Sequence, residues 1–299
     1  MVRLATNPIA PILGQHVPLR GPARLLFRSY AKAHHSGNAQ KKTTTRNGDN
    51  FEIDVASFLE WHIWAFGSFE AHFAELFERL VLPGDRCIDV GANVGVHTIR
   101  LAKLVGSRGE VIAIEPDTEL AHRAGNNLRL NGLSNVRVIE AAADRRSGGK
   151  VILYRPDNLD SNKARASMLH HSYLTGSTVE VQTVAIDDIC PGPVALIKID
   201  VEGFEQAVVE GAVSTIAHHQ PAVIFEYAPN LLDGKAHSPF GWFAEHGYEL
   251  FGMRQQRNAV TGRGGLGLNR LRALPAVGGD IVALPGATVQ RVTSLVRSQ

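Results

Sequence analysis

The central part of the sequence alternates short apolar runs with longer segments that have a helical period. The runs 87–91, 110–115 and 194–201 are rich in Ile and Val, which is typical of strands buried on both faces of a sheet. Between the first two runs, residues 96–105 place apolar side chains three or four positions apart, as on the inner face of a helix. This alternation predicts an α/β fold with a parallel sheet covered by helices on both faces. Ligands of such folds bind at the carboxyl ends of the strands.

The chain has 299 residues, 44% of them hydrophobic, which is enough for one large α/β core with appendages. We expect a folded domain over residues 50–285, preceded by a flexible basic arm over 1–49 and followed by a tail over 286–299. The stretch 150–186 breaks the alternation with two strands around a polar segment, which predicts an inserted hairpin. The Arg- and Gly-rich stretch 254–279 predicts a mobile loop.

Basic charge is concentrated at the N-terminus, where residues 1–48 hold eight Lys or Arg and no Asp or Glu. Organelle import through a transit peptide is one interpretation, but no clear cleavage signal follows, and a flexible arm on a cytoplasmic protein is the prediction. Cys87 and Cys190 are too few for a disulfide framework and fit a reducing compartment. No apolar run has the length of a transmembrane helix. The formal net charge of +2 argues against a nucleic-acid binder that relies on bulk charge.

A glycine-containing loop follows the first strand of the alternation, from Asp89 to Gly95. Gly91 allows a sharp turn and a close approach of a ligand to the backbone, and Gly95 lets the next helix begin near that ligand. A dinucleotide-binding loop would have its second and third glycines where this chain has Asn93 and Val96. Three interpretations remain at this point: a dinucleotide loop, a structural turn, or a loop for S-adenosylmethionine (SAM), whose cationic end suits Asp89.

An acid ends the next apolar strand, because Glu115 closes the run 110–115 and lies 24 residues after Gly91. A carboxylate at about this spacing is placed to accept hydrogen bonds from both hydroxyls of an adenosine ribose. The alternative is a solvated acid that caps the following helix. With the glycine loop, the pattern indicates an adenosine-containing ligand, which includes both NAD and SAM.

Charged residues interrupt the apolar strand at 194–201. Side chains alternate along a strand, so Lys198 and Asp200 share one side. Charges in such a strand are costly unless paired, and a structural ion pair of Lys198 with Asp200 or with Glu226 would satisfy that requirement. Asp200 and Glu202 lie at the carboxyl end of the strand, where the site is expected, which favours a functional role.

Taken together, these motifs resemble the FkbM-type family of SAM-dependent methyltransferases. The resemblance runs from about residue 51 to residue 284 and is carried by the segments 88–95, 115–116, 131–136, 197–205 and 223–226. The Lys-Ile-Asp-Val-Glu-Gly run is its most specific part, since many class I methyltransferases share the glycine loop and the acid. The resemblance implies a Rossmann-like sheet of seven strands, mostly parallel with an antiparallel last strand. It also implies SAM as methyl donor and, in most members, a hydroxyl oxygen as acceptor.

The resemblance also implies which residues contact SAM. Glu115 would hold the ribose, Ala142 would lie near the adenine, and Asp200 and Glu202, with Lys198 in the same run, would face the methyl group. The residues implied at the amino-acid end of SAM are Asp89, Gly91, Asn93, Gly95 and Thr98. His97 follows the loop and is predicted to be a solvent-facing helix residue.

The chemistry at the strand end stays open. Asp200 or Glu202 would act as general base, because two close carboxylates raise the pKa of one of them, or the pair would hold a divalent cation. The expected acceptor is a small molecule, a glycan or a lipid, and nucleic acid is not favoured. Three other functions remain: a nicotinamide-dependent oxidoreductase, which the missing glycines oppose; a non-catalytic scaffold, which the intact motif residues oppose; and an RNA methyltransferase that uses the basic arm.

Overall fold

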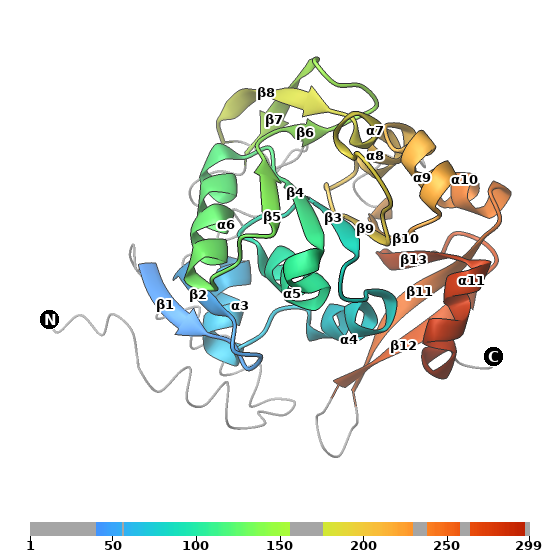
Figure 1. Ribbon diagram of the computed structural model, residues 1–299, viewed down its shortest axis with the longest axis horizontal. Coiled ribbons are helices and arrows are strands. Elements are labelled where there is room, and N and C mark those ends of the chain that lie inside the picture. Colours follow the sequence, from blue (N-terminus) through green and yellow to red (C-terminus); the bar gives the residue numbers. More distant parts are fainter. Residues whose placement is uncertain (1–39, 56, 156–175, 230–237, 258–263, 297–299) are drawn as a thin grey trace, which may run out of the picture.

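The computed structural model describes residues 40–55, 57–155, 176–229, 238–257 and 264–296. Its centre is an eight-stranded sheet in the order β12-β11-β13-β10-β9-β3-β4-β5 (Figure 1). Five neighbouring strands are parallel: β10 (Ala222–Tyr227), β9 (Leu196–Ile199), β3 (Arg86–Val90), β4 (Glu110–Ile114) and β5 (Val136–Ile139). Three more run antiparallel to their neighbours: β13 (Gly279–Pro285), β11 (Tyr248–Arg257) and β12 (Gly264–Leu271). The predicted Rossmann-like α/β class is confirmed, with eight strands in place of seven.

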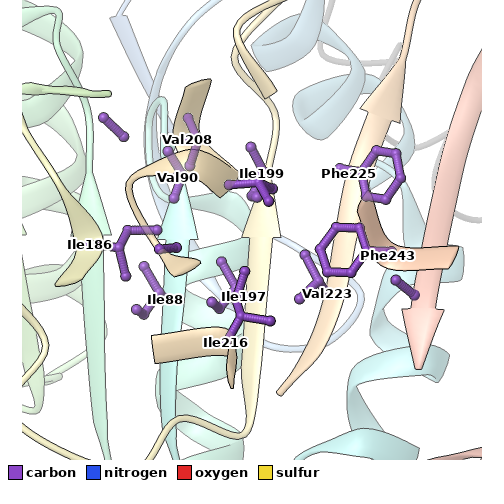
Figure 2. Close-up of a cluster of buried hydrophobic side chains, with 14 of the residues drawn as sticks. Ile88, Val90, Ile186, Ile197, Ile199, Val208, Ile216, Val223, Phe225 and Phe243 are labelled. Carbon is purple, nitrogen blue, oxygen red and sulfur yellow. The ribbon is translucent and has the colours of Figure 1, made fainter. Parts of the chain in front are cut away.

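Helices cover both faces of this sheet, because successive strand side chains point to opposite sides. One apolar cluster joins the sheet to α8 (Glu205–Glu210), α9 (Val213–His219) and α10 (Phe240–Glu245). Figure 2 shows its strand residues, among them Ile88, Ile197 and Phe225, packed with Val208, Ile216 and Phe243. A second cluster joins the other face to α4 (Ala71–Leu80) and α5 (Val96–Val105). A third packs α3 (Phe58–Phe66) with β2 (Asn50–Asp54) and α6 (Thr118–Leu130).

The same alternation carries charged residues to one face near the carboxyl ends of the strands. Asp89 on β3 is in register with Lys198 on β9, and Glu226 on β10 is in register with Asp280 on β13. Leu196 and Ile224 share the parity of these positions and belong to the cluster under α4 and α5. The charged groups of four strands therefore meet on the face that α4 and α5 cover.

The prediction of a mobile loop over 254–279 is wrong in part. β11 continues to Arg257 and pairs with β12 in an antiparallel hairpin, in which Met253 is opposite Leu268. Leu266 and Leu268 alternate with glycines, and both are buried in the cluster beneath α4. The glycines have low strand propensity, but packing of these two leucines stabilises the strand. Residues 258–263 lie outside the described residues.

The boundary predicted for the basic arm is also wrong in part. β1 (Gln40–Thr44) pairs with β2, so the folded part begins at least ten residues before Asn50. A turn joins the two strands, with the Thr45 amide donating to the Asp49 carbonyl at 2.8 Å. The remainder of the predicted arm, 1–39, lies outside the described residues.

The inserted hairpin is confirmed in its two strands. β7 (Lys150–Tyr154) pairs with β8 (Thr178–Val184), and β8 also pairs with β6 (Ala142–Ala143) in a small second sheet. Residues 156–175 lie outside the described residues. The predicted tail begins with α11 (Gly286–Val289) and a 3-10 turn over Gln290–Leu295, and α7 (Ile186–Ile189) and a 3-10 turn over Gly106–Arg108 complete the elements. No helix in the described ranges has the length and apolar character needed to cross a bilayer.

Candidate active site

A cavity of about 290 Å³ opens at the carboxyl ends of β3, β4 and β9. It lies where the parallel topology predicts a ligand. Seven of the predicted site residues line it: Gly91, Asn93, Glu115, Ala142, Lys198, Asp200 and Glu202. Asp89, Gly95 and Thr98 do not line it.

The glycine loop depends on the absence of a side chain at Gly91. This residue has φ +77°, and a Cβ on it would lie 1.9 Å from the carbonyl oxygen of Asp200. The loop therefore touches the end of β9, and the amides of Gly91 and Ala92 donate to the Ile114 carbonyl at 2.9 and 3.1 Å. Only glycine allows this approach of three strand ends.

Asp89 is fully buried behind the loop. Its Oδ2 accepts a 2.6 Å hydrogen bond from the Thr98 hydroxyl at the start of α5. Its Oδ1 has no hydrogen-bond partner among the described residues and lies 3.8 Å from Lys198 Nζ. Asp89 and Thr98 thus hold the first turn of α5 against the end of β3.

Glu115, which follows β4, is also buried and contacts the glycine loop. It accepts hydrogen bonds from the amides of Asn93 at 2.8 Å and Asp117 at 3.0 Å. Burial raises the pKa of Glu115 to about 7 in spite of these bonds. The alternative role of helix cap belongs to Asp117, whose side chain accepts from the amides of Glu119 and Leu120 in α6.

Lys198 is the centre of the charged residues on β9. Its Nζ lies 3.1 Å from Asp200 Oδ2, and its side chain is 4% exposed while that of Asp200 is 40% exposed. Burial alone would lower the pKa of Lys198, but the carboxylates of Asp200, Asp89 and Glu70 outweigh burial and raise it. Of the two ion pairs considered from the sequence, the structure contains the one with Asp200.

Carboxyl groups that the sequence analysis did not assign to the site surround this pair. Glu226 lines the cavity, and its Oε2 is buried without a hydrogen-bond partner in the described part of the chain. Burial and the nearby charges of Asp200, Glu202, Glu205 and Asp280 raise the pKa of Glu226 to about 9. Burial also raises the pKa of Glu205 to about 7. From the sequence, Glu226 was considered only as an ion-pair partner of Lys198, and its strand parity on β10 was the signal that could have placed it in the cavity.

The prediction of a solvent-facing His97 is wrong. Its side chain is 11% exposed, and its Nε2 lies 2.9 Å from Oε2 of Glu70. The rings of Phe73 and Phe77 pack on it, with centroids 4.7 and 5.7 Å away. The cause is the packing of α4 over the first turn of α5, which no pattern within α5 indicates.

Among the described residues, no three His, Cys, Asp or Glu side chains are arranged so that they could hold a metal ion. The cavity nevertheless gathers several carboxyl groups around one buried lysine, so its charge favours a cationic ligand.

Comparison with known proteins identifies the family of this chain. The family model described as the methyltransferase FkbM domain matches residues 89–250, more than half of the sequence. The chain is 41% identical over 56 residues to a protein-L-isoaspartate O-methyltransferase of Methanococcus aeolicus, a match that covers 19% of this chain and 26% of that protein. It is 38% identical over 71 residues to a ribosomal protein L11 methyltransferase of Acetivibrio thermocellus, covering 24% and 22%. The chain thus spans about a quarter of the length of these curated relatives.

A similar solved structure is the methyltransferase FkbM of Methylobacillus flagellatus KT. The sequence identity is 16% and the TM-score 0.44, over 74% of this chain and 52% of that one. The family match leaves the nicotinamide-dependent alternative without support. The chain belongs to the FkbM-domain family of SAM-dependent methyltransferases.

Proposed function

We propose that this methyltransferase transfers the methyl group of SAM to a hydroxyl oxygen of a small molecule, a sugar or a lipid, and that Asp200 accepts the hydroxyl proton. One observation carries the proposal: Asp200 is a partly exposed carboxylate in the cavity that a buried lysine holds at 3.1 Å. A carboxylate fixed in this way can take a proton from an acceptor that reaches the end of β9.

The residues of the cavity fit SAM in charge. SAM carries one net positive charge, and the cavity presents the carboxyl groups of Glu70, Asp200 and Glu202 around it. Gly91 and Asn93 line the cavity, so the backbone of the glycine loop is within reach of a ligand there. We assign the amino-acid end to Gly91 and Asn93, supported by Gly95, Asp89 and Thr98, the ribose to Glu115 and the adenine side to Ala142.

Bound SAM supplies an electrophilic methyl group on a sulfonium, and the chain's own groups position the acceptor. Lys198 keeps Asp200 oriented through its ion pair. Glu202, at φ +52° on the wall of the cavity, lies beside Asp200 in sequence and shares the acceptor side. Glu226, with a pKa near 9, is protonated at neutral pH and can donate a hydrogen bond to an acceptor oxygen.

The charge of the cavity argues for a neutral acceptor. Phosphate groups of RNA would meet Asp200, Glu202 and Glu70, which repel them. The same repulsion disfavours an acceptor with an ionised carboxylate. A hydroxyl compound without negative charge avoids this cost.

The test is methyl transfer from SAM with a labelled methyl group to panels of hydroxyl compounds, glycans and lipids, with RNA and proteins alongside. We expect a product whose label withstands mild alkali, as an ether does and an ester does not. Label in RNA, or only in an alkali-labile protein product, would contradict the proposal.

The matched variant is Asp200→Asn, which keeps the size of the side chain. We expect it to lower kcat about 10²-fold or more, in the range of general-base catalysis, with affinity for the demethylated product S-adenosylhomocysteine within about threefold of wild type. Unchanged turnover would remove Asp200 from the chemistry. Glu78→Gln, on the outer side of α4 and paired with Arg100, serves as the control.

A further inference from the structure

We propose that Glu70, held in place by His97, binds the α-ammonium group at the amino-acid end of SAM. The inference goes beyond the family motif, because Glu70 lies in the segment that connects α3 to α4, before the residues that the family model matches. It rests on SAM being the cofactor.

The first observation is the position of Glu70. It lines the cavity together with Gly91, Asn93 and His97. It also has φ +45°, a conformation unfavourable for a residue with a Cβ. Glu70 shares positive φ with two other non-glycine residues of the cavity wall, Asn93 and Glu202. Unfavourable backbone conformations of this kind are typical of ligand-binding positions.

The second observation is the hydrogen bond between Glu70 and His97. A carboxylate only accepts hydrogen bonds, so His97 Nε2 carries the proton and donates it to Glu70 Oε2 at 2.9 Å. The packing of Phe73 and Phe77 fixes the imidazole ring. The Glu70 side chain remains 33% exposed, and Glu70 lines the cavity. His97 therefore orients a carboxylate that can still reach a ligand.

The third observation is charge. Burial would raise the pKa of Glu70, but the hydrogen bond and charge of His97, with Lys198 and His72, outweigh burial and lower it. Glu70 is therefore ionised at neutral pH. SAM has two cationic groups, the sulfonium and the ammonium, and only the ammonium has N–H donors for a carboxylate.

The location of Glu70 also favours the ammonium group of SAM. His97 lies in the first turn of α5, two residues after Gly95, on the side of the loop assigned to the amino-acid end. Glu115, assigned to the ribose, accepts a hydrogen bond from the Asn93 amide, and Ala142, assigned to the adenine side, belongs to β6 in the small second sheet. Glu70 thus completes the amino-acid end of the site from outside the glycine loop.

The experiment compares two ligands by calorimetry. S-adenosylhomocysteine contains the amino-acid end, and 5′-methylthioadenosine has the same adenosine and a thioether without it. For Glu70→Gln we expect affinity for S-adenosylhomocysteine to fall about tenfold or more, and affinity for 5′-methylthioadenosine to change less than about twofold.

Variants of His97 separate orientation from direct contact. His97→Leu should show the same pattern with a smaller loss, and His97→Gln should recover part of the affinity, because an amide N–H can donate to Glu70. Glu78→Gln is the matched control, since it removes a carboxylate of α4 that pairs with α5 away from the cavity. Glu70→Gly removes the carboxylate and relieves the positive φ, so it tests the proposal even if Glu70→Gln folds poorly.

Three results would overturn the proposal. One is unchanged affinity of Glu70→Gln for S-adenosylhomocysteine, and another is an equal loss for both ligands, which indicates a distorted loop. A third is a loss for SAM alone, which would place Glu70 at the sulfonium. If the wild-type protein binds neither ligand, the assignment of SAM as cofactor is wrong. This outcome is distinct from failure of the Glu70 proposal, which is judged by comparing the variants with a wild-type protein that binds.

Discussion

Replacing Gly91 with alanine tests the contact between the glycine loop and β9. The new Cβ would lie 1.9 Å from the Asp200 carbonyl oxygen, where about 3 Å is the closest approach that proteins show, so the two segments must separate by about 1 Å. The hydrogen bond from the Asp200 amide to the Val90 carbonyl, at 3.0 Å, opposes that movement. The substitution therefore strains the wall of the cavity where we propose that cofactor and acceptor meet.

The expected loss in the free energy of unfolding of Gly91→Ala has two parts. Alanine at φ +77° costs about 1–2 kcal/mol because of its left-handed backbone. Overpacking against backbone adds about 1–3 kcal/mol. Together we expect a loss of about 2–5 kcal/mol in the free energy of unfolding, and a loss of affinity for S-adenosylhomocysteine.

Gly132→Ala is the matched control, because Gly132 has φ +66° and no atom within 4 Å of the Cβ position. It should lose only the conformational part, about 1–2 kcal/mol, and should retain ligand affinity. Urea unfolding and calorimetry measure the two quantities. Equal stability losses in the two variants, or full ligand affinity in Gly91→Ala, would refute the reasoning.

Two further predictions concern the edge strand β12 and the buried acid Glu115. Leu268→Ala should lower the free energy of unfolding by about 2–5 kcal/mol in urea titrations, because Leu268 is fully buried under α4. A loss below about 0.5 kcal/mol would contradict the packing of β12 against the core. Glu115 has a folded-state pKa raised from 4.5 to about 7, so its protonated form stabilises the fold below about pH 4.5, and this stabilisation is lost as the pH rises to 7. Relative to Glu115→Gln, wild-type stability should therefore fall between pH 4.5 and 7 in the absence of ligand; parallel pH curves would contradict the assignment.

Patterns in the sequence predict the parallel strands of the sheet and most residues of the cavity. Apolar strands followed by Asp89, Glu115 and Asp200 put polar groups at strand ends, and parallel topology brings those ends to one edge. The need for glycine at position 91 also follows from a sharp turn between strand and helix. These features depend on neighbours in the chain and on strand parity, which local patterns encode.

The tertiary structure alone decided which distant side chains complete the site. His97 is buried because α4 packs over α5, and Glu70 reaches the cavity through that same packing. Glu226 has its high pKa because four strand ends concentrate carboxyl groups on one face. β12 forms because Leu266 and Leu268 find an apolar surface under α4, against the propensity of their glycine neighbours. The burial and the electrostatic environment of these positions depend on residues that are far apart in the chain. They therefore arise only when the fold brings those residues together.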